Sequence, residues 1–162
     1  MIQTVLFDFA RVLLFVQDRA YQGSLSQYYQ QLIGQHTSIW DCYRLNEELL
    51  TVLKNTYQHQ YQLAILTASE TLPRHPEVAP KLTSLFNPIL LAKELGVSKD
   101  QPACYTTVCK ILQKKPTEVV FIDDSARNVA AAQTAGLPTI HFSDTQSALK
   151  ELALLTHDHS TL

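Results

Sequence analysis

The chain has 162 residues, 46% of them hydrophobic, which is enough for one globular domain with a substantial core. Its formal net charge of −2 gives no electrostatic basis for binding nucleic acid or an anionic membrane, and no apolar run approaches the roughly 20 residues that span a bilayer. The uncharged N-terminus does not resemble a signal peptide and the three cysteines lack metal-ligand spacing, so we expect reduced thiols and a cytoplasmic protein.

Five short apolar runs without helical periodicity are predicted to be buried parallel strands. They cover residues 5–7, 63–66, 89–91, 119–122 and 139–142. Helical patterns lie between them, beginning after Asn46, at Pro102, after Ser125 and at Gln146. Strands that alternate with helices predict an α/β fold with a doubly wound parallel sheet.

One segment interrupts this alternation. Residues 17–45 are rich in Gln and Tyr and follow the first strand, which predicts an insertion into the fold. The remainder, 1–16 and 46–156, would form the core of a single domain, and residues 157–162 a loose C-terminal tail.

Polar side chains follow three of the predicted strands, as Asp8, Thr67, and the pair Asp123 and Asp124. Ligands bind outside the carboxyl ends of parallel strands, where the strand order reverses. Acidic groups gathered there repel one another unless a hard cation lies between them, and Mg²⁺ prefers such oxygen ligands. Taken singly, Thr67 and Asp124 could be helix caps, and Lys99 could be a surface lysine.

Four segments resemble, in order, the four motifs of the haloacid dehalogenase-like (HAD) hydrolase superfamily. Residues 5–13 are similar to its first motif, a strand ending in Asp-x-Asp-Gly, and 66–69 are similar to the second. Residues 94–99 resemble the third, and 121–128, followed by an alanine-rich helix, resemble the fourth. The resemblance implies a sheet ordered 3-2-1-4-5 and a short helical cap at 17–45, formed by two small helices.

The resemblance also implies a role for each matching residue. Asp8 would be the nucleophile that forms an aspartyl-phosphate. Thr67 and Ala68 would bind the transferring phosphoryl group, and Lys99 would neutralise both nucleophile and phosphate. Mg²⁺ would be held by Asp8, by the backbone carbonyl of Ala10, and by Asp123 and Asp124. Asn128 would lie nearby in a supporting role.

Two positions depart from the first motif. The family's second Asp, which protonates the leaving group and activates water, is Ala10 here, and its Gly is Arg11. A positioned general acid–base contributes about 10²–10⁴-fold, so we expect a slow Mg²⁺-dependent phosphohydrolase or phosphotransferase. Its substrate would be a small phosphorylated compound or an acyl phosphate, whose leaving group needs no proton, and Arg11 would contact the phosphate.

Four alternatives remain open or are disfavoured. Ala10 and Arg11 also suit a non-catalytic descendant that binds phosphate, metal or a protein partner. Dehalogenases lack the second Asp too, and dehalogenation stays open as an alternative. Phosphonatases carry Ala at that position, but phosphonatases need a cap lysine and residues 17–45 contain none. Receiver domains place their acidic pair after the first strand, whereas here the pair follows the fourth.

Overall fold

The structure is a computed structural model that describes residues 1–18, 20–32 and 38–156. The predicted tail at 157–162 and a part of the predicted cap therefore lie outside the described residues. The elements, in chain order, are β1 (Thr4–Phe7), β2 (Leu14–Val16), α1 (Leu25–Leu32), η1 (Ile39–Asp41), β3 (Tyr43–Leu45), α2 (Glu47–Val52), η2 (Leu53–Tyr57), β4 (Gln62–Thr67), η3 (Leu72–Arg74), α3 (Ala79–Thr83), β5 (Ile89–Leu91), α4 (Pro102–Leu112), η4 (Pro116–Glu118), β6 (Val119–Asp123), α5 (Ala126–Thr134), β7 (Thr139–His141) and α6 (Thr145–Thr156).

The main sheet has five strands in the order β5-β4-β1-β6-β7, and every neighbouring pair is parallel. Numbered along the chain, these strands lie in the order 3-2-1-4-5, which confirms the predicted α/β fold. Strand β1 is central, with Phe7 level with Ile65 of β4 and Ile122 of β6. The carboxyl ends of β4, β1 and β6 therefore meet at one edge of the sheet.

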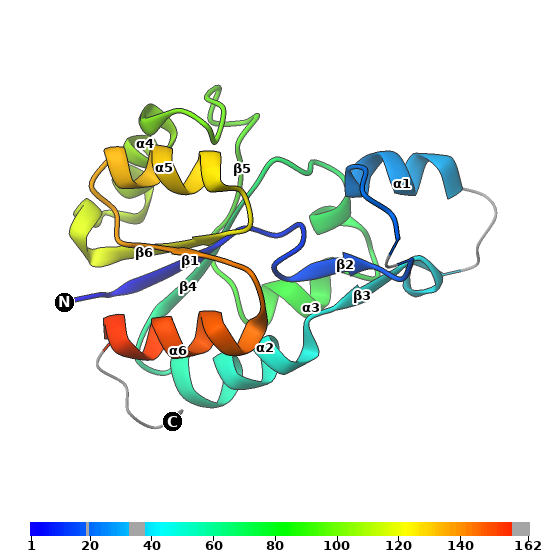
Figure 1. Ribbon diagram of the computed structural model, residues 1–162, viewed down its shortest axis with the longest axis horizontal. Helices are drawn as coiled ribbons and strands as arrows, with labels where there is room; N and C mark the ends of the chain where they lie inside the picture. Colours follow the sequence, from blue (N-terminus) through cyan, green and yellow to red (C-terminus); the bar gives the residue numbers. More distant parts are fainter. Residues whose placement is uncertain (19, 33–37, 157–162) are drawn as a thin grey trace.

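Helices cover both faces of the sheet, with α4 and α5 on one side and α2 and α6 on the other (Figure 1). Successive side chains of a strand point to opposite faces, so β1 contributes to two separate cores. Leu6 packs in the core beneath α4 and α5, whereas Val5 and Phe7 pack in the core beneath α2 and α6. Burial on both faces explains why the strands are continuous apolar runs without alternation.

The insertion after β1 begins with the short strand β2 and ends with β3, and the two strands pair antiparallel. We call this pair the hairpin, although residues 17–42 lie between its strands. The insertion carries the helix α1 and the short 3-10 helix η1, and projects to one side of the main sheet (Figure 1). The buried Tyr43 ties the parts together, because its hydroxyl donates a 2.6 Å hydrogen bond to the carbonyl of Leu25. The cap was predicted as two small helices, and the hairpin was not foreseen, since its three-residue strands are too short to show a period.

Helix starts follow the predicted capping residues. Asn46 accepts from the backbone N–H of Leu49 at the start of α2, and Ser125 accepts from that of Asn128 at the start of α5. Gly136 takes a φ of 90° after α5, a backbone conformation that favours glycine. Of the helices in the described parts of the chain, none is both long and apolar enough to cross a lipid bilayer.

Candidate functional site

Three carboxylates meet at the carboxyl edge of the sheet. Asp8 directly follows β1, Asp123 ends β6, and Asp124 is the next residue. One oxygen of each lies within 4.8 Å of the others. Asp8 and Asp123 are buried and Asp124 is partly exposed, so the cluster has an open side. Strand order alone creates this juxtaposition, because β1 and β6 are neighbours although their ends are far apart in sequence.

Lys99 is the cation of this cluster. It lies between β5 and α4, is only 5% exposed, and places its Nζ 2.6 Å from Asp8 Oδ1 and 2.7 Å from Asp123 Oδ2. Tyr105 of α4 fixes the backbone there, since its hydroxyl donates to the Lys99 carbonyl at 2.7 Å. The ammonium also lies 5.5 Å from the centre of the Phe121 ring. A lysine that sequence alone could assign to the surface is thus a buried partner of two carboxylates.

The electrostatics of the cluster shift three pKa values. Burial raises the pKa of Asp8 to about 6, and the Asp123 charge adds to this increase while Lys99 opposes it. The pKa of Asp124 is also raised, by burial first and then by Asp123, with Arg11 opposing. Burial lowers the pKa of Lys99, but the charges of Asp8 and Asp123 outweigh burial and raise it overall. Three carboxylates thus share one buried ammonium, and the Asp123 charge adds to the effect of burial on Asp8 and Asp124.

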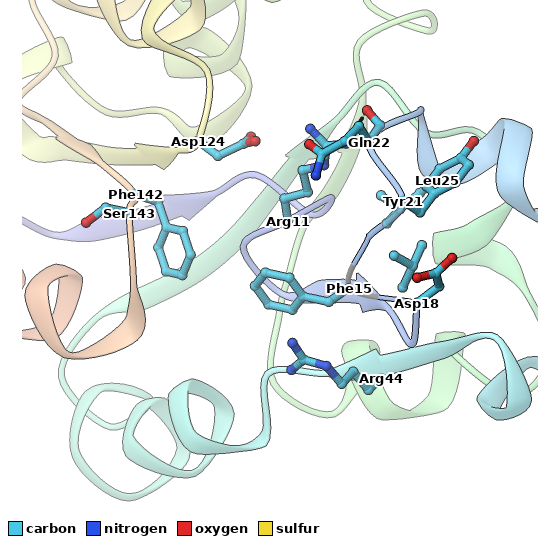
Figure 2. A pocket seen from close by; sticks show the side chains of 11 residues that line it. Arg11, Phe15, Asp18, Tyr21, Gln22, Leu25, Arg44, Asp124, Phe142 and Ser143 are labelled. Carbon is cyan, nitrogen blue, oxygen red and sulfur yellow. Dashed lines mark hydrogen bonds between the residues drawn. The ribbon is translucent and has the colours of Figure 1, made fainter.

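Asp123 is fully engaged by the protein. Besides Lys99, it accepts from the backbone N–H of Ser125 at 2.7 Å and from Asn128 Nδ2, which lies 3.2 Å from Oδ1 and 3.1 Å from Oδ2. Asn128 thus lies beside the cluster, as expected, and its contact is with Asp123. Asp124 differs, because its side chain faces the open space opposite Arg11 (Figure 2).

The donor set fits a hard divalent cation. All available ligand atoms are oxygens, the surplus charge is negative, and Asp8 and Asp124 keep oxygens that Lys99 does not neutralise. Within the cluster, Asp8 and Asp124 would hold such an ion. The backbone carbonyl of Ala10 is a further ligand that the motif resemblance implies. Asp123 would contribute mainly by charge, since its hydrogen bonds already commit it to the protein.

A hollow of about 640 Å³ opens in front of Asp8, and we call it the nucleophile hollow. It is lined by Thr67, which ends β4, by Ala68 and Ser69 after it, and by Lys99 and Asn128. Thr67 Oγ1 accepts from the backbone N–H of Ser69 at 3.0 Å, which turns the chain around the hollow. Ser69 was not among the predicted site residues, although its place two residues after the strand end was a usable signal.

Ala10 and Arg11 border the site from the loop after β1. Ala10 lines the nucleophile hollow with a methyl group, which can neither donate nor accept a proton. Arg11 has a φ of 61°, in the left-handed region that usually favours glycine. Its Nη2 donates to the carbonyls of Gln22 and Gly23 in the insertion, at 2.8 and 2.9 Å. Arg11 was predicted to contact substrate, and the structure places its guanidinium on these carbonyls.

Sequence comparison identifies relatives for part of the chain. Bifunctional epoxide hydrolase 2 of Rattus norvegicus is 38% identical over 76 residues, which are 47% of this chain and 14% of that protein. Sesquiterpene phosphatase astK of Aspergillus oryzae is 32% identical over 71 residues, or 44% of this chain and 36% of that protein. The matched segments therefore span well under half the length of these curated relatives.

Solved structures share the fold over nearly the whole chain. A 2-haloacid dehalogenase from Pseudomonas syringae superposes with a TM-score of 0.69 at 15% identity, covering 97% of this chain and 99% of that one. A HAD family enzyme of Bacteroides thetaiotaomicron, in complex with magnesium and inorganic phosphate, gives a TM-score of 0.57 at 16% identity, covering 86% and 93%. The profile of the haloacid dehalogenase-like hydrolases matches residues 2–136, and the chain belongs to this family of hydrolases.

Proposed function

We propose that the chain is a Mg²⁺-dependent phosphohydrolase or phosphotransferase that works through an aspartyl-phosphate on Asp8. The observation that carries the proposal is the buried contact between Lys99 Nζ and Asp8 Oδ1, 2.6 Å long, beside an open hollow and Asp124, a carboxylate with no ion pair to Lys99. A carboxylate held in this way is fixed in one orientation, and the ammonium beside it attracts an anionic substrate.

The proposed reaction has two steps. A carboxylate oxygen of Asp8 attacks phosphorus, and the bond to the leaving group breaks with its electron pair going to the leaving oxygen. Water then attacks the aspartyl-phosphate, which releases phosphate and regenerates Asp8. Lys99 and Thr67 would face the phosphoryl oxygens from the two sides of the nucleophile hollow, and bound Mg²⁺ would supply further neutralisation of their charge.

Ala10 determines which substrates would suit this site. Because its methyl group cannot donate a proton, an alkoxide leaving group would have to depart unprotonated. Acetate and nitrophenolate leave readily as anions, so acyl phosphates and nitrophenyl phosphate would lose least from the missing acid. The proposal is therefore an enzyme that is slow on alkyl phosphates and best on activated ones.

The test is turnover of acetyl phosphate and p-nitrophenyl phosphate in Mg²⁺ and in EDTA, by wild type and by Asp8→Asn. We expect Mg²⁺-dependent release of phosphate that Asp8→Asn reduces to background. Glu151→Gln, an exposed acid-to-amide change on α6, is the matched control and should retain full activity. Full activity of Asp8→Asn would contradict the nucleophile assignment.

Two other functions would give different experimental results. A non-catalytic descendant would turn over neither phosphate ester while still binding Mg²⁺ in calorimetry. A dehalogenase would release halide from a 2-haloacid without Mg²⁺, which a halide electrode measures. Arg11 gives no direct support to either alternative. Its guanidinium donates hydrogen bonds to carbonyls of the insertion and so is not free to hold a phosphate.

A further inference from the structure

A second hollow, about 340 Å³ in volume, lies between the hairpin and the end of β7. We call it the hairpin hollow. Phe15 and Arg44 line it from the hairpin, Phe142 from the segment after β7, and Arg11 and Asp124 from the side of the metal-ligand cluster (Figure 2). Its size suits a small organic group, since ligand sites usually begin at about 300 Å³.

The hairpin hollow adjoins the proposed reaction site through residues that line both. It shares Arg11 and Asp124 with an intermediate hollow that is also lined by Ala10 and Ala68. That intermediate hollow in turn shares Ala10 and Ala68 with the nucleophile hollow. A molecule whose phosphoryl group lies at Asp8 would therefore reach the hairpin hollow by extending over Ala10 and past Arg11 and Asp124.

The walls of the hairpin hollow are aromatic and cationic. The rings of Phe15 and Phe142 lie 6.5 Å apart at 42° and contribute apolar surface to the lining of the hollow. The Arg44 guanidinium lies 4.8 Å from the centre of the Phe15 ring. The part of the chain that the structure describes shows no ion pair between Arg44 and a carboxylate, so this exposed cation stays open to a ligand.

The charges around the hollow would favour an anion once a divalent ion is bound. Two carboxylates line it, Asp18 and Asp124, and two guanidiniums, Arg11 and Arg44. Asp124 is committed to the proposed metal site, and Asp18 Oδ1 accepts from the backbone N–H of Ala20 at 2.9 Å. With a divalent ion bound at Asp124, the lining as a whole would carry a net positive charge.

We infer that the hairpin hollow binds the leaving-group part of the substrate, and that this part is a flat or apolar skeleton with a second anionic group, a carboxylate or a phosphate, held by Arg44. The inference rests on the proposed function, because it extends the substrate from the phosphoryl site at Asp8. The skeleton would lie against Phe15 and Phe142, and the distal anion would take a charge-assisted hydrogen bond from the guanidinium.

Equilibrium binding tests the inference without any need for turnover. The probes are phenyl phosphate, para-carboxyphenyl phosphate and para-phenylene bisphosphate, titrated by calorimetry in Mg²⁺ into the Asp8→Asn protein. We expect a compound with the second anion to bind about tenfold more tightly than phenyl phosphate, the effect of one charge-assisted hydrogen bond. Of the two probes with a second anionic group, the one that binds more tightly relative to phenyl phosphate identifies the distal group as carboxylate or phosphate.

Adding Arg44→Gln to the same background should reduce this tenfold preference to about one. Lys110→Gln, which removes an exposed cation from α4, is the matched control and should leave the preference in place. Equal affinities for all three probes, no measurable binding of any probe, or a preference that survives Arg44→Gln would each overturn the inference. Acetyl phosphate, which carries no skeleton, tests the proposed function separately, so failure of one does not imply failure of the other.

Discussion

Asn46 is the residue at which the insertion returns to the core, and we expect Asn46→Ala to destabilise the fold strongly. Its Nδ2 donates to the carbonyl of Val12 at 3.0 Å and contacts Thr145 Oγ1 at 2.9 Å, while its Oδ1 accepts from the Leu49 N–H at 3.2 Å. Losing the helix cap costs about 1 kcal/mol, and leaving buried polar groups without partners costs about 1–3 kcal/mol more. The expected loss is therefore about 2–4 kcal/mol in the free energy of unfolding, or roughly 5–15 °C in Tm.

Urea unfolding followed by circular dichroism measures this loss directly. Asn55→Ala, an exposed asparagine in the segment after α2, is the matched control and should change stability by less than about 0.5 kcal/mol. Thr145→Val, alone and combined with Asn46→Ala, completes a double-mutant cycle, and the two residues should couple by about 0.5–1.5 kcal/mol. A cost below about 1 kcal/mol for Asn46→Ala, with no coupling, would refute the reasoning.

Three further predictions concern the cluster and the insertion. Lys99→Met leaves Asp8 with an uncompensated buried charge and should cost about 3–5 kcal/mol by urea unfolding in EDTA; an equal stability to wild type would contradict the buried ion pair. Mg²⁺ should raise the Tm of the wild type in a thermal-shift assay, and Asp124→Asn should abolish that increase; an undiminished increase would place the ion elsewhere. Glu77 accepts from Ser38 Oγ at 2.6 Å, which lowers its pKa, so its stabilising effect is present above its ordinary value of 4.5 and is lost as pH falls through the lowered one. Glu77→Gln should therefore remove a part of the acid sensitivity of unfolding, and identical pH profiles would contradict this.

The sheet and the carboxylate edge could be predicted from the sequence because both depend on local patterns. A buried parallel strand is a short apolar run, and a polar residue at its end marks the edge where ligands bind. Asp8 and Asp123 each stand at such an end, and the motif resemblance supplied the strand order that makes them neighbours. The helix starts at Asn46 and Ser125 followed from capping residues in the same local way.

The remaining features depend on contacts that no local pattern carries. The contact between Lys99 and Asp123 joins a loop to a distant strand, so the sequence linked this lysine only to Asp8 and phosphate. The hairpin pairs residues on the two sides of the insertion, and each of its strands has only three residues. The hydrogen bonds of Arg11 to the carbonyls at Gln22 and Gly23 depend on where the insertion lies, which composition does not reveal.

The two-stranded hairpin has a consequence for how the molecule opens. Each of its strands has one hydrogen-bonded neighbour, whereas β1 has one on each side, in β4 and β6. Because a strand pair by itself is only marginally stable, amide hydrogens at 14–16 and 43–45 should exchange with solvent well before those of β1. Local unfolding would thus begin at the wall that carries Phe15 and Arg44, while the strands that carry Asp8 and Asp123 stay protected.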